Sequence, residues 1–250
     1  MAMTQQIAVI ADVHGNTWAL DAVLADIARR GIGTTLNLGD CVYGSLDPAG
    51  AAERLMRPGI ITVAGNQDRE VFAPTAQQRA AADHAYVTGR LSAAQVAWLA
   101  GCPPTLALGE LFCCHGTPGS DTTYLLEHVS EHGVALSGTP MIAAQLAGVE
   151  QPVVLCGHSH VPRVVGLPGG RLVVNPGSVG MPAYDEDTPY PHVMEAGSPH
   201  ARYAVLTRSA RGWDVEQVVL SYDWNAAAAL ALRNGRPDRA RWIATGRAAG

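Results

Sequence analysis

The stretch Val153-Val154-Leu155-Cys156-Gly157-His158-Ser159-His160 decides how the rest of the chain is interpreted. Its first half is a short apolar run, rich in β-branched residues and bounded by Pro152 and Gly157, which predicts a buried strand. Two histidines separated by one residue follow where this strand ends. Imidazole has an unperturbed pKa of about 6.5 and is the commonest metal ligand in proteins. The stretch therefore predicts a metal-binding loop, provided that other ligands follow other strands; otherwise it is an ordinary exposed loop.

The composition restricts the classes of protein to which the chain can belong. Its 250 residues are enough for a sizeable core, and 48% hydrophobic with 16% charged residues is ordinary for a globular protein. The net charge of −5 gives no support to a general binder of nucleic acids or anionic membranes. All 17 basic residues are arginine. Their identity excludes a Walker-type phosphate loop, a pyridoxal Schiff base and a lysine general base.

The number of cysteines and the hydropathy of the chain predict the cellular compartment of the protein. The five cysteines form an odd set without the spacing of a disulfide framework. The first predicted strand begins at Gln6, which leaves no room for a signal peptide. No apolar run approaches the roughly 20 residues that a membrane span needs. We therefore expect a reduced, soluble, cytoplasmic protein.

Away from the opening stretch, the same pattern recurs: an apolar strand, a polar cluster and then a helix. This repetition predicts an α/β architecture whose functional groups lie at the carboxyl ends of the strands. The predicted strands cover residues 6–11, 35–38, 60–63, 111–114, 153–156 and 171–174. The first two predicted helices cover residues 20–31 and 47–57, the second with Asp47 as N-cap and Pro48 at its first position.

The remaining segments carry weaker patterns. Ser92 is the predicted N-cap of one helix, Thr139-Pro140 opens another, and Asp223 caps a third that ends near Arg233. We predict mostly helices over 69–110, two helices over 121–148, an irregular loop over 181–200, a hairpin over 202–220, and a short helix and frayed tail at the end. Neither a repeat nor a linker is evident. We therefore expect one domain over 1–250, with its core in about 6–220 and C-terminal helices over 223–250.

Polar residues that could bind metal follow five of the predicted strands. They mix carboxylate and amide oxygens with imidazoles, which suits manganese, iron, zinc or similar ions better than calcium. A catalytic zinc typically takes three protein ligands, so seven side chains exceed one site and suffice for two ions if one carboxylate bridges. The seven are Asp12, His14, Asp40, Asn66, His115, His158 and His160. His128 and His132 stand four apart within a predicted helix, and we interpret them as a solvated face.

The sequence resembles the calcineurin-like metallophosphoesterases, and especially their small bacterial and archaeal single-domain phosphodiesterases. The resemblance runs from about residue 6 to 220 and is specific, because five motifs agree in the family's order. These motifs are Asp12-Val13-His14, Gly39-Asp40, Gly65-Asn66, His115-Gly116 and Gly157-His158-Ser159-His160. The turn Asn175-Pro176-Gly177-Ser178 is also similar to that subgroup. The resemblance implies a four-layer α-β-β-α sandwich with mixed sheets and a dinuclear metal site at the strand ends.

By the same resemblance, each candidate ligand has an expected role. Asp12, His14 and His160 would hold the first metal; Asn66, His115 and His158 would hold the second; and Asp40 would bridge both. Asp40, Asn66 and His115 are the expected catalytic residues, and Asn16 and Gln67 are expected to bind substrate. We expect two divalent ions, Mn²⁺ first, with Fe, Zn, Ni or Co as alternatives. Two ions about 3.5–4 Å apart share a water, lower its pKa and clamp phosphate oxygens, which predicts attack by a metal-bridging hydroxide on a phosphodiester.

The chain departs from the family in two places. Many relatives carry a histidine after the asparagine motif, thought to protonate the leaving group, but Gln67 stands here, and an amide donates no proton at neutral pH. General acid catalysis is typically worth 10²–10⁴-fold, so we expect diesters with acidic leaving groups. The second departure is the segment 181–200, which has Ala183 where an arginine is expected. We consider it a solvated loop or a lid or dimer contact, and expect 69–110 and 181–200 to shape the pocket.

Three other interpretations stay open at this stage. The first is a phosphomonoesterase of the same fold that acts on nucleotides or phosphoproteins. The second is a non-catalytic scaffold, as in the retromer subunit that resembles this family. The third, a mononuclear oxygenase with two histidines and a carboxylate, leaves Asn66, His115 and His158 unexplained. As partners we expect a small phosphoester substrate, no stable complex with nucleic acid, no membrane, and a possible homo-oligomer.

Overall fold

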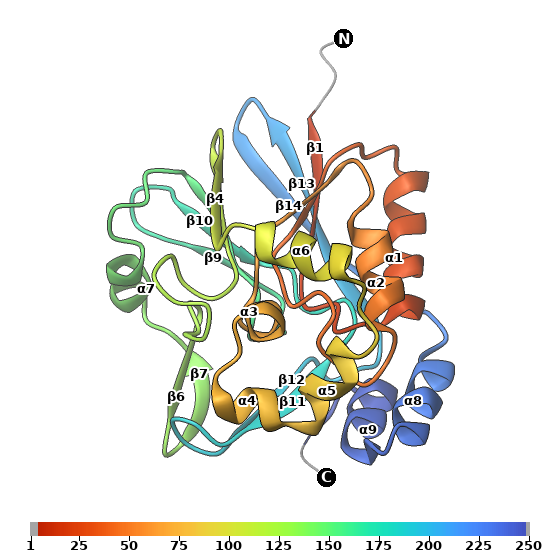
Figure 1. Cartoon of the computed structure of the whole chain (residues 1–250). Coiled ribbons are helices and arrows are strands. Elements are labelled where there is room, and N and C mark those ends of the chain that lie inside the picture. Colours follow the sequence, from red (N-terminus) through yellow and green to blue (C-terminus); the bar gives the residue numbers. More distant parts are fainter. Residues whose placement is uncertain (1–4, 249–250) are drawn as a thin grey trace.

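Two five-stranded sheets form the centre of the structure, a computed structural model that describes residues 5–248 (Figure 1). The strand order is β14-β13-β1-β2-β3 in the first sheet and β4-β5-β8-β10-β9 in the second. The first sheet consists of β1 (Gln6–Ile10), β2 (Thr35–Asn37), β3 (Ile60–Thr62), β13 (Ala201–Ser209) and β14 (Gly212–Leu220). The second consists of β4 (Thr105–Leu108), β5 (Leu111–Cys114), β8 (Val153–Leu155), β9 (Arg163–Gly166) and β10 (Leu172–Asn175).

Both sheets are mixed, and their central strands are parallel. In the first sheet β1, β2 and β3 run parallel, with Val9 opposite Leu36 and Leu36 opposite Ile61, while β13 is antiparallel to β1. In the second sheet β5, β8 and β10 run parallel between two antiparallel edge strands. Parallel strands covered on both faces need near-continuous apolar sequences, and this is why the apolar runs located these strands.

Alternation along β1 shows how the layers are built. Ile7 and Val9 point into a core between the two sheets, whereas Ala8 and Ile10 point into a core under helices, because successive strand residues face opposite sides. The helices over the first sheet include α1 (Thr17–Arg29), α2 (Pro48–Leu55) and α6 (Ala93–Gly101). On the far side of the second sheet lies α7 (Thr139–Gln145) (Figure 1). The predicted four-layer α-β-β-α sandwich is therefore confirmed.

The predicted helix starts are confirmed at three caps. The side chain of Asp47 accepts a hydrogen bond from the Gly50 N–H, with Pro48 in the first turn. Ser92 caps α6, and Asp223 caps α8 (Trp224–Arg233). A short final helix, α9 (Pro237–Thr245), follows as expected. The predicted tail extends to residues 249 and 250, which lie outside the described part of the chain.

Two predicted segments are wrong. Residues 121–148 contain one helix, α7, preceded by a hairpin of β6 (Glu127–Ser130) and β7 (Gly133–Leu136), so His128 and His132 share no helix face. Residues 181–200 form a second hairpin, β11 (Ala183–Glu186) and β12 (His192–Glu195), rather than an irregular loop. In β6 and β12 burial alternates residue by residue, which is the period of a strand. Each strand is only four residues long, too short for that period to outweigh competing patterns.

The segment 69–110 is mostly helical, as predicted, and it ends in the edge strand β4. It contains most of α3 (Asn66–Phe72), followed by α4 (Ala76–Ala80), α5 (Ala82–Thr88) and α6. Strand β9 was not anticipated. All five cysteines are free. Within residues 5–248, no helix combines the length and apolar character that a membrane crossing requires.

If the core between the two sheets holds the fold together, truncating a side chain within it should lower the free energy of unfolding. Leu155 on β8 is fully buried there, so Leu155→Ala should lower the free energy of unfolding by about 2–5 kcal/mol through lost burial and a residual cavity. Leu232→Ala on α8 is the matched control, because Leu232 is 59% exposed and should change stability by no more than about 0.5 kcal/mol. Urea denaturation measures both, and similar losses for the two variants would contradict the assignment of this core.

Candidate metal centre and pocket

The structure brings the seven candidate ligands together from strand ends that are far apart in the sequence. Asp12, His14 and His160 place one ligand atom each within 4.8 Å of one another, and so do Asp40, His115 and His158. Asn66 joins the second group, with its Oδ1 3.1 Å from His115 Nε2. The two histidines of Gly157–His160 thus lie in different groups, as the sequence suggested.

Asp40 lies between the two groups. Its Oδ2 is 3.9 Å from His14 Nε2 in the first group and 3.5 Å from His115 Nε2 in the second. Its Oδ1 accepts a hydrogen bond from the Gln67 N–H at 3.0 Å, which fixes the plane of the carboxylate. This is the position that a bridging carboxylate needs.

The backbone at these residues is strained. Among the described residues, only five non-glycine residues have a left-handed φ, and all five are candidate ligands: Asp12 (57°), His14 (50°), Asp40 (55°), His158 (67°) and His160 (60°). Such conformations cost free energy for residues with a Cβ and persist only where the surroundings impose them. Their confinement to one cluster indicates that the fold stores strain here for a function.

Glycines let these loops approach one another. A Cβ at Gly39 would lie 2.4 Å from the backbone nitrogen of Gly65, and one at Gly180 would lie 1.9 Å from the Val13 carbonyl oxygen. The close approach at Gly180 accompanies a hydrogen bond from its N–H to the Asp12 carbonyl at 3.1 Å. The Asp12 N–H also donates to the Gly39 carbonyl, and the His14 N–H to the Asp40 carbonyl, both at 3.0 Å. The loops that carry the ligands are therefore hydrogen-bonded directly to one another.

Backbone carbonyls fix the protonation of three ligand imidazoles. The Nδ1 of His14, His115 and His160 lies 2.9, 2.7 and 2.5 Å from the carbonyl oxygens of Tyr43, Leu38 and Met181, respectively. A carbonyl oxygen only accepts, so each Nδ1 carries the hydrogen. In the neutral ring the Nε2 lone pair then points into the cluster, an arrangement typical of metal-ligating histidines.

These lone pairs make the cluster fit a cation. His14 Nε2 and His160 Nε2 face each other at 3.1 Å, and in the neutral rings neither carries a hydrogen to donate to the other. Asp12 Oδ2 is buried without a hydrogen-bond partner. Acceptors gathered in this way repel one another and are costly to bury unless a cation lies among them. Mixed imidazole and oxygen donors suit manganese, iron, zinc and related ions.

Burial and neighbouring charges shift the pKa values of the cluster in opposite directions. Burial, reinforced by the nearby histidines His160 and His115, lowers the pKa of His14 and of His158 to about 4 in each case. Burial also opposes the charged form of His115, but the Asp40 carboxylate outweighs it and raises the pKa of His115 to about 10. Conversely, His115 and His14 hold the pKa of Asp40 well below its usual range despite burial. At neutral pH the metal-free cluster therefore keeps a proton on His115.

Several positioning residues escaped the sequence analysis. The fully buried Asp68 accepts hydrogen bonds from the Cys41 N–H and the Gly65 N–H, and so ties the Asp40 loop to the Asn66 loop. Burial and the charge of Asp40 raise the pKa of Asp68 to about 6. The only signal was Asp68 at the third helical position after Gly65, where a side chain commonly returns to the N-cap backbone.

The Asn175–Ser178 turn, noted in the sequence, secures the other loops. The Asn175 side chain donates to the Gly157 carbonyl at 2.8 Å and to Ser159 Oγ at 3.1 Å. Ser178 Oγ donates to the Asp12 carbonyl at 2.8 Å. The turn therefore orients the loops that carry Asp12 and both histidines of the opening stretch.

Of the two predicted substrate contacts, one is misplaced. Gln67 lines the pocket at the cluster, and its Oε1 is buried without a partner. Asn16 is fully buried and caps α1 by accepting from the Ala19 N–H, while its amide donates to the Gly180 carbonyl and to Tyr222 Oη. These bonds occupy the Asn16 side chain, so the expectation of a substrate contact there is corrected to a structural role.

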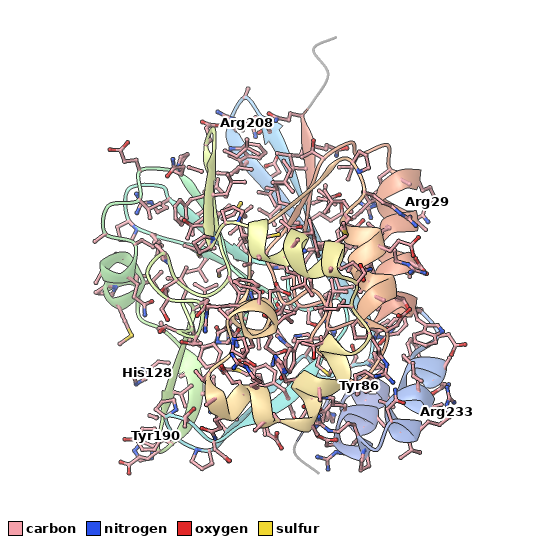
Figure 2. All side chains as sticks on the ribbon, viewed as in Figure 1. Arg29, Tyr86, His128, Tyr190, Arg208 and Arg233 are labelled. Carbon is pink, nitrogen blue, oxygen red and sulfur yellow. The ribbon has the colours of Figure 1, made fainter. Side chains whose placement is uncertain are left out.

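A pocket of about 920 Å³ opens over the cluster. One side is formed by the segment 122–129 and α7, another by β11 and the loop after it, and a third by α9. Of the segment 69–110 only Glu70 lines it, so the expectation that this segment shapes the pocket is wrong, whereas that for 181–200 is confirmed. Figure 2 shows His128, which lines this pocket, and Tyr190 at the edge of the molecule, on the side of the β6–β7 hairpin. The contribution of α9 was not anticipated.

Two tyrosines in this pocket pack on the ligand rings. The Tyr124 ring stacks on His158 with centroids 4.8 Å apart, and Tyr184 meets His160 edge-on at 4.6 Å. Tyr184 Oη donates its one hydrogen to the His158 carbonyl at 3.0 Å and lies 2.8 Å from the Tyr124 hydroxyl, within hydrogen-bond distance. The tyrosines hold the histidine rings from the pocket side, while the carbonyls hold three of the four from behind.

Comparison with known proteins agrees with this description. The family model described as "Calcineurin-like phosphoesterase superfamily domain" matches residues 5–195. A metallophosphoesterase from Sphaerobacter thermophilus has a similar structure, with a TM-score of 0.76, 24% identity, and coverage of 97% of this chain and 99% of that one. A proposed diadenosine tetraphosphatase shares the fold at a TM-score of 0.55 and 16% identity, covering 87% of this chain and 95% of that one.

A shorter match is found with an uncharacterized protein of Methanocaldococcus jannaschii, 42% identical over 66 residues. The match spans 26% of this chain and 27% of that relative. It carries no information on the activity of the whole chain.

The division of ligands into two groups predicts how metal content responds to mutation. His158→Ala and His160→Ala should each lower the metal bound per chain from about two ions to about one, because each removes a ligand from a different group. Elemental analysis of dialysed protein measures this. His132→Ala, whose side chain is 86% exposed, is the control and should keep both ions. Loss of both ions in either single variant would show that the groups do not load separately.

The raised pKa of His115 predicts that metal binding releases a proton. Since its pKa is about 10, a metal that binds at its Nε2 must displace a proton at pH 7, and affinity should fall as pH falls below 10. Calorimetric titration with Mn²⁺ in buffers of different ionisation enthalpy should show about one proton released from this residue. The His115→Ala variant should release about one proton fewer per chain when Mn²⁺ binds. Buffer-independent heats for the unmodified protein would contradict the assignment.

Proposed function

The chain belongs to the calcineurin-like phosphoesterase superfamily, and on that basis we propose that it is a metal-dependent phosphodiesterase acting on small molecules. The observation that carries the proposal is the pair of Asp/His groups that meet at Asp40 beneath a large pocket. We propose two divalent ions as cofactors, with Mn²⁺ the first to test. When bound there, such ions lower the pKa of a water molecule and neutralise phosphate oxygens.

The residues of the chain define the remaining requirements of the reaction. Asp12 and Asp40 are the carboxylates of the two groups, and together they offset only half the charge of two divalent ions. The residual positive charge attracts a phosphate to a chain that is acidic overall. Two further residues border the place where the reacting phosphate would bind. They are Asn66, whose Oδ1 lies beside His115, and Gln67, whose backbone N–H donates to Asp40.

Two features favour a diester over a monoester. Gln67 occupies the position of the leaving-group acid and cannot donate a proton at neutral pH, so efficient hydrolysis requires a leaving group that departs as an anion. The pocket of about 920 Å³ is also lined both by the 122–129 segment and by α9. A diester has a group on each side of phosphorus, and a pocket of this size gives room for both. Asp185 and Glu186 at the rim oppose a polyanion such as nucleic acid.

An aryl phosphodiester series with graded leaving-group pKa tests the proposal in the presence of Mn²⁺. The rate should rise steeply as the leaving-group pKa falls, and Asp40→Asn should lower kcat roughly 10²-fold or more, a size typical of losing one electrostatic stabiliser. A panel of nucleotides and phosphopeptides in the same assay covers the phosphomonoesterase alternative.

The variant Gln67→His introduces a side chain that can protonate the leaving group at the position where Gln67 cannot. It should speed substrates with poor leaving groups and flatten the dependence on leaving-group pKa. A flat dependence in the unmodified protein would show that another residue supplies the proton. Full activity in Asp40→Asn would exclude a mechanism that uses both groups, and the absence of hydrolysis across the panel would favour the scaffold.

A further inference from the structure

The wall of the pocket formed by α9 carries two side chains that the chemistry of the metal centre does not use. Arg239 and Trp242 stand three residues apart, so they lie on the same face of the helix, and both line the pocket. They are also well buried, with 9% and 6% of their surface exposed. A long cationic side chain on a short surface helix usually extends into solvent. Here it is turned inward instead.

Each of these side chains has a donor without an acceptor. Arg239 Nη1 and Trp242 Nε1 are buried and have no hydrogen-bond partner. Burying a donor unpaired costs free energy, more so when the group is charged. Two such donors one helical turn apart, on side chains that both line the same pocket, are therefore expected to meet an acceptor that enters it.

The ion pairs around Arg239 engage only one of its two terminal nitrogens. Asp83 on α5 accepts from Arg239 Nη2 at 2.7 Å, but it also accepts from Arg236 Nη1 at 2.5 and 2.6 Å. Asp238 pairs with Arg236. Arg239 thus shares one carboxylate with a second arginine, and burial lowers its pKa in spite of Asp83. An additional anionic oxygen beside Nη1 would complete the pairing.

This donor pair lies next to the metal centre. Trp242 packs in one apolar cluster with Met181 and Ala183. The Met181 carbonyl oxygen is in turn the acceptor for His160 Nδ1. His160 and Met181 line the same pocket as Arg239 and Trp242, so the first ligand group and these side chains of α9 border one cavity.

We propose that Arg239 Nη1 and Trp242 Nε1 form a subsite for a second phosphate group of the substrate, carried on the arm that is not the leaving group. The inference rests on the proposed phosphodiesterase function and narrows its substrate class to small diesters with a distal phosphate. A phosphate suits the subsite because its several oxygens accept from a guanidinium and an indole N–H at once, and charge-assisted hydrogen bonds are the stronger ones.

A matched pair of substrates tests the subsite. Two aryl alkyl phosphodiesters are compared that differ only in whether the alkyl arm ends in a phosphate or a hydroxyl. We expect kcat/KM to favour the phosphate-ended substrate by roughly tenfold or more, mostly through KM, the size of a charge-assisted hydrogen bond. Arg239→Gln and Trp242→Phe should each reduce this preference, measured as the ratio of kcat/KM for the two substrates within each variant.

Two further variants separate the subsite from general charge and folding effects. Arg239→Lys should restore part of the preference, because it restores the charge without the planar donor geometry. Arg233→Gln removes an exposed arginine from α8, visible at the edge of the molecule in Figure 2, and should keep the full preference. Thermal melting confirms that each variant is folded.

Binding of non-hydrolysable phosphonate analogues of the same pair, measured by calorimetry, separates the two proposals. Tighter binding of the phosphate-ended analogue that depends on Arg239 supports the subsite even if neither diester is hydrolysed, an outcome that would overturn only the proposed function. Hydrolysis of both diesters with equal kcat/KM, or an unchanged preference in Arg239→Gln, would overturn the subsite.

Discussion

The structure depends on the sharp left-handed turns with which the chain leaves its strands. Five of the candidate ligands adopt a conformation that disfavours any residue with a Cβ, and they do so within one cluster. The free energy that holds them comes from their surroundings: an apolar core between two sheets beneath them, backbone hydrogen bonds between the loops, and the buried Asp68. Rigid placement has a chemical purpose here, since it forces acceptors such as His14 Nε2 and His160 Nε2 to 3.1 Å and so creates a position for a cation.

The ligand cluster could be predicted from the sequence because its signals are local. Each polar cluster lies just after an apolar run that predicts a strand, and alternation around Ser159 already indicated that His158 and His160 face different ways. What failed depended on tertiary contacts. The hairpins β6–β7 and β11–β12 consist of four-residue strands. From the sequence Asn16 was expected to contact substrate. In the structure its side chain caps a helix and donates hydrogen bonds to Gly180 and Tyr222.

Backbone carbonyls, and not only ionisable side chains, determine which ring nitrogen of the ligand histidines carries the hydrogen. By accepting from Nδ1 of three histidines, the carbonyls of Tyr43, Leu38 and Met181 select the tautomer whose Nε2 faces the centre. No substitution of a side chain at those three positions removes the acceptor, so tautomer selection is built into the path of the backbone. The side chain of Asp40 has a separate role: it lies between the two groups and raises the pKa of His115.

The distribution of these parts along the chain bears on how specificity arises. The candidate ligands lie within residues 5–195, the range that the family model matches, whereas α9 (Pro237–Thr245) lies beyond it and still forms one wall of the pocket. The helix is attached through an apolar cluster that includes Trp242, Met181 and Ala183, so its position is coupled to the loop that carries the acceptor for His160. A segment outside the matched range can therefore change which substrate arm is accepted while the strand-end turns, and with them the chemistry, stay fixed. The buried Arg239 is the residue at which such a change would have its first effect, because its side chain lines the pocket, its Nη1 has no hydrogen-bond acceptor and its Nη2 is paired with Asp83 on α5.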